Sequence, residues 1–511
     1  MDDDTDTFKQ LVQGTAFVFV GNIVGLGATF LTRIIAANQL APSGYGLVVL
    51  GASIINIVSI GVLLGLPAAL GQRLPRVDDK PGLFRDTLLI AMPLATATAL
   101  VLGLYADTVS ALLNEPGFTP VLVVFAVSLP FFVLMKLVVA GFRGLESALG
   151  RVVVQNLGHQ GLKAVGVIGF ALLGLGPLVI AIGWAGAFVL AGLSGLVYLH
   201  IRTNLVAGAR WRVRPDPVRT RSILSFSLPL VLSSGVVLML QYGDNFLLAY
   251  FRNSNAVGIY DAAYTLGRTL LIFLATFKFL FVPMISRLHE AEDRSEMGQL
   301  YRLVTKWVVF VTFPVFFVFV LFPTTSLELL FRTEYTVGST ALVVLSIGFF
   351  VHILMGLNAG ALVAMGYSKA ILYGNIMSFG SNVALNLVLI PEFGLVGAAL
   401  ASAGSYTVMN GFYQYNLVRF GRINPFPKSV LLPLGSSFVL FGIPSVMYGS
   451  VISSTLPRFF GFISFFGVLY LGLIVTFGFD ADDIDFILSA VDQTPIPTAP
   501  VRSILEALNR K

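Results

Sequence analysis

The chain has 511 residues, of which 56% are hydrophobic and 11% are charged, whereas an average soluble protein carries roughly 25% charged residues. So few charges cannot cover the surface of a soluble fold of this size, so the composition argues against a soluble enzyme. The net charge is +6. We attribute this charge to membrane topology, and we expect no nucleic-acid partner. The sequence contains no cysteine, which excludes thiolate metal sites, cysteine nucleophiles and disulfides.

Fourteen segments have about the 20 mostly apolar residues that a membrane-spanning helix needs. Their apolar runs are continuous and do not alternate with period two, so they predict helices and not a barrel. The first ten residues are acidic, so the first segment is not expected to be a cleavable signal peptide. The segments lie near 13–36, 45–71, 87–112, 119–141, 152–173, 178–200, 222–250, 256–285, 305–326, 338–364, 369–390, 395–418, 429–449 and 459–478.

The distribution of Lys and Arg among the loops predicts the orientation of these spans. Twenty of these residues lie in loops that follow even-numbered spans, whereas loops that follow odd-numbered spans hold only Arg252, Arg332 and Arg458. Cytoplasmic loops of membrane proteins are enriched in Lys and Arg. The sequence therefore predicts a multi-pass protein of the cell membrane with both termini in the cytoplasm.

Two similar halves divide the chain. The segment Pro42–Gly46 opens the second span much as residues 255–260 open the eighth, and the link 174–181 is similar to the link 391–398. Six spans per half give a parallel repeat, an arrangement typical of transporters. We predict an N-terminal six-helix lobe (1–201), a basic cytoplasmic linker (202–221), a C-terminal six-helix lobe (222–421), helices 13 and 14 (422–478) and a cytoplasmic tail (479–511).

Five cations lie within the predicted spans: Arg33, Lys136, Lys163, Arg268 and Lys278. A charge at the centre of a bilayer costs about 2.5–3.5 kcal/mol on insertion scales, so such residues mark functional sites by default. Arg33, Lys136 and Lys278 lie closer to span ends, where long side chains reach the interface. Lys163 and Arg268 lie near mid-span. We predict that these cations line a water-filled cavity that binds an anionic group such as phosphate.

Further polar residues share helix faces with these cations at spacings of three, four and seven. The alternative for each is an ordinary hydrogen bond between helices. Asp244 is predicted either to pair with Arg33 or to bind a coupling cation. The predicted polar or coupling residues of the cavity are Asp244, Asp261, His159, Asn22, Gln241 and Tyr264.

No catalytic constellation and no P-loop pattern occurs in the sequence, so we expect neither an enzyme nor an ATP-driven motor. No cofactor or metal site is predicted. Transport energy is expected from an ion gradient, with proton or sodium coupling as candidates, from the membrane potential, or from the substrate gradient.

Three stretches carry a resemblance to a known family: LAPSGYGLVVL (40–50), YGDNFLLAYFRNSNAVGIYDAAYTLGR (242–268) and IPEFGLVGAALAS (390–402). With fourteen spans in a six-six-two plan, the chain resembles the oligosaccharide flippases of the polysaccharide transporter family, within the multidrug/oligosaccharidyl-lipid/polysaccharide superfamily. The resemblance implies an all-α alternating-access transporter. It also implies translocation of a lipid-linked oligosaccharide, carried on phosphate or pyrophosphate, from the cytoplasmic to the outer leaflet.

The resemblance further implies membrane lipids as partners and glycan-assembly enzymes as candidate protein partners. The alternative function is an ion-coupled exporter of small organic molecules, like the multidrug extruders. Those proteins usually have twelve spans and an acidic residue in the cavity of their first half, whereas the first span of this chain carries Arg33 and no acidic residue. A glycan polymerase or ligase is a third hypothesis.

Overall fold

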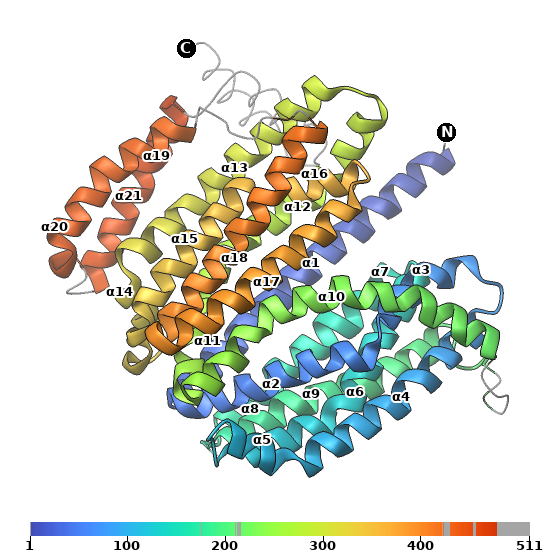
Figure 1. Ribbon diagram of the computed structural model, residues 1–511. Helices are drawn as coiled ribbons and strands as arrows, with labels where there is room; N and C mark the ends of the chain where they lie inside the picture. Colours follow the sequence, from blue (N-terminus) through green and yellow to red (C-terminus); the bar gives the residue numbers. More distant parts are fainter. Residues whose placement is uncertain are drawn as a thin grey trace. The chain divides into compact units, whose positions relative to one another are not determined.

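The computed structural model describes residues 2–174, 176–209, 211, 216–421, 423, 430–452 and 456–477, and the predicted tail 479–511 lies outside these ranges. Throughout the described ranges the secondary structure is helical, without strands. The residues form two compact units, whose helices are drawn in Figure 1. Unit 1 comprises residues 1–265, 330–338 and 382–398, and unit 2 comprises residues 266–329, 339–381 and 399–511. These units differ from the predicted lobes, whose boundaries stay a prediction.

Unit 1 is built around the long apolar helix α6. Helices α9, α4, α3 and α2 pack against α6, and its side chains Phe125, Leu129 and Val133 are buried. The π-helical segment η2 lies between α7 and α8. The elements are α1 (Asp2–Gln39), α2 (Pro42–Leu63), α3 (Leu66–Arg73), η1 (Leu74–Arg76), α4 (Lys80–Leu104), α5 (Ala106–Leu112), α6 (Phe118–Gly144), α7 (Ala148–Val152), η2 (Val153–Gly161), α8 (Leu162–Ala171), α9 (Gly176–Arg202), α10 (Pro217–Phe251) and α11 (Ser254–Arg268).

Unit 2 has a core rich in phenylalanine. Phe317 stacks on Phe466 at a ring distance of 4.8 Å, and the Tyr470 hydroxyl donates a hydrogen bond to the carbonyl of Phe310. All of η3 and parts of α17 and α18 belong to unit 1. The remaining elements are α12 (Leu271–Glu290), α13 (Arg294–Leu321), α14 (Pro323–Leu330), η3 (Thr333–Gly338), α15 (Ser339–Met355), α16 (Asn358–Ala364), α17 (Ser368–Phe393), α18 (Leu395–Asn416), η4 (Leu417–Gly421), α19 (Leu431–Ser437), η6 (Phe438–Gly442), α20 (Ile443–Ile452) and α21 (Leu456–Phe477).

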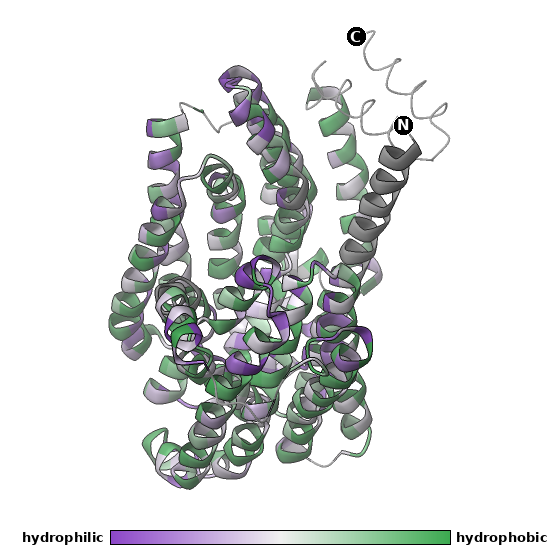
Figure 2. Cartoon of the chain, turned by 90° about the vertical axis from the view of Figure 1, so that its right-hand side faces the viewer, coloured by the Kyte–Doolittle hydropathy of each residue, from purple (hydrophilic) through white to green (hydrophobic). Residues whose placement is uncertain are grey.

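Within the described residues, ten helices are long and apolar enough to cross a membrane. Figure 2 shows hydrophobic residues along the helices and hydrophilic residues gathered mainly at helix ends and loops. The four other predicted spans (13–36, 152–173, 222–250 and 395–418) are helical but are not among the ten. In 152–173 the reason is local, because α7, η2 and α8 are each short. The count of fourteen spans therefore stays a prediction.

The predicted span 256–285 contains a break at Thr269 and Leu270, where α11 ends and α12 has not yet begun. The Thr269 hydroxyl donates a hydrogen bond to the carbonyl of Leu266 at 2.7 Å. Such local side-chain hydrogen bonds compete with the helical pattern. The apolar run alone gave no sign of this break.

Candidate functional site

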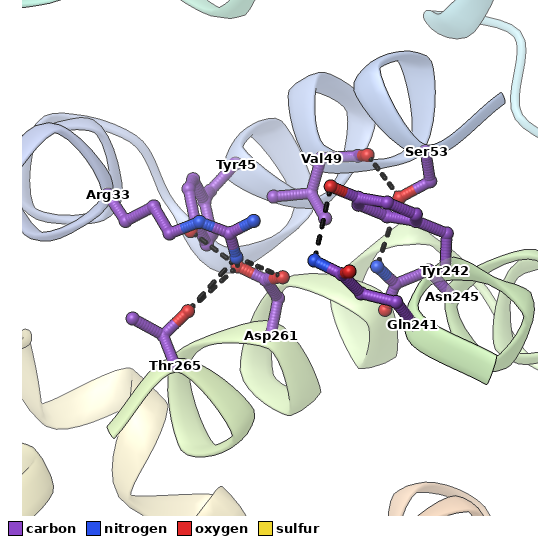
Figure 3. Close-up of polar contacts among 9 residues, drawn as sticks. All are labelled: Arg33, Tyr45, Val49, Ser53, Gln241, Tyr242, Asn245, Asp261 and Thr265. Carbon is purple, nitrogen blue, oxygen red and sulfur yellow. Dashed lines mark hydrogen bonds and ion pairs between the residues drawn. The ribbon is translucent and has the colours of Figure 1, made fainter. Parts of the chain in front are cut away.

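Arg33 forms a buried ion pair with Asp261. Its NH1 atom lies 2.5 Å from both carboxylate oxygens and donates a further hydrogen bond to the Thr265 hydroxyl at 3.0 Å. The Tyr45 hydroxyl donates to the same carboxylate at 2.6 Å. We call these four residues the Arg33 cluster (Figure 3). Removing one partner of a buried ion pair typically costs about 3–5 kcal/mol, because the other charge stays desolvated.

Local structure explains how the cluster assembles. Arg33 lies near the end of α1, and Tyr45 lies in the first turn of α2, which begins at Pro42. Asp261 and Thr265 are four residues apart on α11, so both face the same side of that helix. The sequence predicted Arg33 and Asp261 as separate cavity residues, and the structure joins them. The carboxylate that pairs with Arg33 is thus that of Asp261.

A second, uncharged contact matches the one made by Arg33. The Asn245 side-chain amide donates a hydrogen bond to the Ser53 hydroxyl at 3.0 Å, and both are buried. Asn245 follows Arg33 by the same number of residues as Thr265 follows Ser53, so the two pairs occupy corresponding positions of the repeat. The contact of Arg33 with Thr265 therefore corresponds to that of Asn245 with Ser53. The first contact includes a charged residue and the second does not (Figure 3).

Two glycines bring α2 and α11 into backbone contact between these clusters. A Cβ atom built on Gly46 would collide with the carbonyl oxygen of Ser254, and one on Gly258 would collide with that of Pro42. The same sequence shift carries Pro42 onto Ser254 and Gly46 onto Gly258. Small residues allow this close approach between helices. We call the contact of these four residues the seam.

Side chains form hydrogen bonds with backbone groups next to the seam. The Tyr335 hydroxyl donates to the carbonyls of Ala37 at 2.9 Å and Leu40 at 3.3 Å. The backbone N–H of Ser254, at the start of α11, donates to the carboxylate of Glu115. These bonds satisfy backbone groups at the end of α1 and the start of α11 that have no partner within their helices.

Lys163 packs against Trp184. Its ammonium nitrogen lies 4.9 Å from the centre of the Trp184 ring, and the residue is only 3% exposed. The guanidinium carbon of Arg33 lies 6.0 Å from the same ring centre. Both distances are within the range of cation–π attraction. Arg33 is paired with Asp261, whereas Lys163 faces the Trp184 ring.

The π-helical segment η2 positions the polar residues next to Lys163. The His159 ring stacks on Phe188 at 5.0 Å, and the Asn156 amide donates to the Asn22 side-chain oxygen at 3.0 Å. The buried His159 Nε2 and Gln160 Oε1 have no hydrogen-bond partner among the described residues. Single π-helical turns are frequent at functional sites. Of the predicted cavity residues, His159 thus lies on irregular helix, and Lys163 lies on the regular helix α8 that follows it.

Asp244 lies in a separate polar group. It is 3% exposed and accepts hydrogen bonds from the Asn386 amide and the Tyr260 hydroxyl, both at 2.8 Å. The Asn386 amide also donates to the Asn382 oxygen at 3.1 Å. The predicted residue Tyr264 lies next to this group, with its ring 5.9 Å from that of Tyr260. The carboxylate and amide oxygens gathered here are the type that hard cations prefer.

The other predicted cavity residues make contacts of their own. The Lys136 ammonium lies over the Phe132 ring at 5.1 Å, and Gln241 donates to the hydroxyl of its neighbour Tyr242 at 3.3 Å. Arg268 and Lys278 belong to unit 2, where Arg268 is exposed at the end of α11. Whether these residues serve a cavity stays a prediction.

Sequence reasoning missed the uncharged partners of the charged residues. Tyr45, Tyr260, Thr265 and Trp184 were not predicted as site residues. Tyr45 and Tyr260 lie in the stretches that carry the family resemblance, and Trp184 is one of three tryptophans. For Thr265 a signal existed, because it lies four residues after Asp261.

Comparison with known proteins identifies the family. A model of the polysaccharide biosynthesis protein family matches residues 11–289, and one of the lipid II flippase MurJ family matches residues 160–470. A probable low-salt glycan biosynthesis flippase, Agl15 of Haloferax volcanii, is 24% identical over 90% of this chain and 94% of its own length. The probable flippase AglR of the same organism is 24% identical over 87% of this chain and 90% of its own.

Solved structures show the same type of fold. The lipid II flippase MurJ in an inward closed conformation matches with a TM-score of 0.68 and 13% identity, over 91% of this chain and 98% of that one. An inward-facing multidrug transporter of the MATE family matches with a TM-score of 0.64 and 15% identity, over 79% and 98%. The fold is that of MATE and MurJ transporters, and the chain is a multi-pass membrane protein. It belongs to the polysaccharide biosynthesis and lipid II flippase families, and thereby to the group of oligosaccharide flippases that its sequence resembles.

Proposed function

We propose that this chain is a flippase that moves a lipid-linked oligosaccharide from the cytoplasmic to the outer leaflet for glycan assembly. The observation that carries the proposal is the match along 90% of the chain to a probable glycan biosynthesis flippase. The buried ammonium of Lys163 supports it, because a desolvated cation suits the phosphate or pyrophosphate of a lipid carrier. The chain acts as a transporter, and its partners are the lipid-linked substrate and membrane lipids. Glycan-assembly enzymes that supply or receive the carrier are candidate protein partners.

In the proposed mechanism, two lobes (1–201 and 222–421) rock about a central cavity that faces each leaflet in turn. Fourteen spans with both termini in the cytoplasm give this arrangement its orientation. The two contacts related by one sequence shift, Arg33 with Thr265 and Asn245 with Ser53, support such a repeat. The cationic residues hold the phosphate, and the uncharged walls accommodate the glycan.

Asp244 is the residue we assign to coupling. Its buried carboxylate, with the Tyr260 hydroxyl and the Asn386 amide, offers a place for a proton or a sodium ion. Binding there neutralises a buried charge, which favours the conformations that keep the group buried. Flipping would then depend on the gradient of the bound ion.

A second candidate function is the ion-coupled export of small organic molecules. The fold match to a MATE multidrug transporter favours it. The ion-paired Arg33 on α1 argues against a cationic drug as cargo, because the cluster offers no uncompensated negative charge.

Deletion of the gene followed by leaflet-resolved analysis of glycan carriers tests the proposal. We expect glycan-loaded carrier to accumulate in the cytoplasmic leaflet, because synthesis continues while translocation stops. Unchanged glycans together with altered sensitivity to drugs would favour the exporter. Accumulation of unpolymerised units on the outer face would favour a polymerase or ligase.

A further inference from the structure

We propose that Asp261 is a placeholder for the substrate's phosphate, and that exchange of the two anions at Arg33 unlocks the seam. In the structure Asp261 neutralises Arg33 and holds α1 to α11. When a lipid phosphate takes the place of the carboxylate, the tie between the helices is released while the guanidinium stays compensated. This inference rests on the proposed function for the nature of the cargo, and it adds a role for Asp261 in opening the transporter.

The geometry of Arg33 allows a second anion to approach before the first one leaves. Its hydrogen bonds to described residues all come from NH1, although a guanidinium has five N–H donors in a fork. Its side chain is 17% exposed, in contrast to the buried Asp261. A phosphate is bound well by such a fork, often in a bidentate manner. The remaining donors are therefore a site of entry.

The position of the cluster explains why its release would open the molecule. Arg33 lies near the end of α1 and Tyr45 lies in the first turn of α2, whereas Asp261 and Thr265 belong to α11. The cluster therefore bridges the two halves of the repeat. The seam lies beside it, with Gly46 against the backbone of α11. In the predicted topology the turns at the seam face outward. Separation of α2 from α11 then corresponds to opening toward the outer leaflet.

Electrostatics makes the exchange selective. Separating Asp261 from Arg33 leaves both charges uncompensated, so the intact pair holds the seam closed while no other anion is present. A phosphate compensates Arg33 and removes that barrier. The matched contact between Asn245 and Ser53 carries no charge, so breaking it is not coupled to any anion. The charged copy of the motif is thus the one that senses cargo.

The experiment uses the absence of cysteine from the sequence. Ser254→Cys places a nearly isosteric thiol at a buried position of the seam. The full chain, purified in lipid nanodiscs, is treated with a bulky hydrophilic maleimide, and the labelling rate reports opening. Dodecyl phosphate serves as the probe for the substrate's head group, and dodecyltrimethylammonium serves as the oppositely charged control.

We expect slow labelling of the reporter alone and labelling roughly tenfold faster with dodecyl phosphate, a change equivalent to about 1.4 kcal/mol in the free energy of opening. Asp261→Asn should label fast without the probe and gain little from it. Asp261→Glu should restore both slow labelling and the response, which shows that a misfolded variant is not the cause. The matched control Asn245→Ala, which breaks only the neutral contact, should respond to dodecyl phosphate like the reporter alone.

Slow labelling of the Asp261→Asn reporter would refute the idea that the pair of Arg33 and Asp261 holds the seam closed. An undiminished response of that variant to dodecyl phosphate would refute the exchange of the carboxylate for a phosphate. These readouts need no glycan and no flipping, so they are separate from the test of function. Normal glycans in the deletion strain would refute the proposed flippase function but not the proposed role of Asp261 in holding the seam closed. Cytoplasmic accumulation of the carrier, together with slow labelling of the Asp261→Asn reporter, would support the flippase function and refute that role of Asp261.

Discussion

At the scale of single residues, the charged side chains differ in how their charge is balanced. Arg33 is neutralised by Asp261 at 2.5 Å, whereas Lys163 faces the Trp184 ring at 4.9 Å. A ring quadrupole stabilises a cation without neutralising it. Lys163 is therefore the side chain that we propose for pairing with the phosphate.

Replacement of Lys163 or Arg268 by Ala is expected to impair transport severely at normal expression. A hydrogen bond to a charged group contributes about 1.5–3 kcal/mol, so loss of one predicts a roughly ten- to hundredfold slower rate. Complementation of the deletion strain, read as carrier in the cytoplasmic leaflet, measures the effect. The matched control is Arg76→Ala, because Arg76 is an exposed loop cation. Full transport by both variants would refute the cationic cavity.

Only part of the site is predictable from its residues. Arg33 and Asp261 stand out as charges within apolar spans, but their pairing joins residues 228 positions apart and depends on how α1 meets α11. By helical spacing alone, Asp261 shares a face with Tyr264 and Arg268, whereas the contact with Arg33 uses Asp261 and Thr265. Likewise, nothing in the sequence indicated the π-helical segment that carries His159.

At the scale of elements, helix ends and helix contacts depend on a few small or polar residues. Gly46 and Gly258 let α2 and α11 touch through their backbones. At the start of α4, the Asp79 carboxylate accepts a hydrogen bond from the N–H of Gly82 at 2.9 Å and pairs with Arg219 at 2.8 Å. These residues set where α4 begins and how closely α2 and α11 approach.

Gly46→Ala is expected to destabilise the folded chain by about 1–3 kcal/mol, the usual cost of overpacking. The added methyl group meets a backbone carbonyl, which cannot rotate away as a side chain can. Thermal unfolding of the purified protein measures the loss. Gly61→Ala, on the same helix, is the control, because no atom lies near a Cβ built there. Equal stability of the two variants would contradict the tight seam.

Asp79→Ala is expected to lower stability by about 1 kcal/mol at neutral pH, as for other N-cap residues. The hydrogen bond from Gly82, with help from Arg219, lowers the pKa of Asp79. Its contribution is therefore complete above the ordinary aspartate pKa and is lost as the pH falls through the lowered value. Unfolding at neutral and acidic pH should show the two proteins converge in acid. Asp78→Ala, at an exposed position, should match the unsubstituted chain, and a pH-independent gap for Asp79→Ala would contradict the cap.

At the scale of the whole molecule, composition determined the class of protein, and loop charges determined the predicted orientation. The helices follow from apolar length, and each of the fourteen predicted segments is mostly helical where the structure describes it. The arrangement into two units does not follow from the sequence, because it depends on contacts such as those of residues 382–398 with unit 1. Periodicity within one helix carries no information on such distant partners.

Single cysteines at Thr333 and Asp78 test the orientation, since the sequence has none of its own and both positions are exposed. In intact cells, an impermeant maleimide should label Thr333→Cys and spare Asp78→Cys, because the loop charges place Asp78 in the cytoplasm. Permeabilised cells should label both. The opposite pattern in intact cells would invert the topology, and with it the direction in which the seam opens.

The matched contacts of the two repeat copies have a consequence for how cargo is oriented. A protein made of two identical copies would present an amphiphile with two equivalent ways to bind, related by the copy-to-copy rotation. Here one of the two matched contacts contains Arg33 and Asp261, whereas the other has Asn245 and Val49 at the corresponding positions. The two copies of the repeat have similar helices but different side chains at these positions. A charged head group therefore has one preferred orientation when it binds.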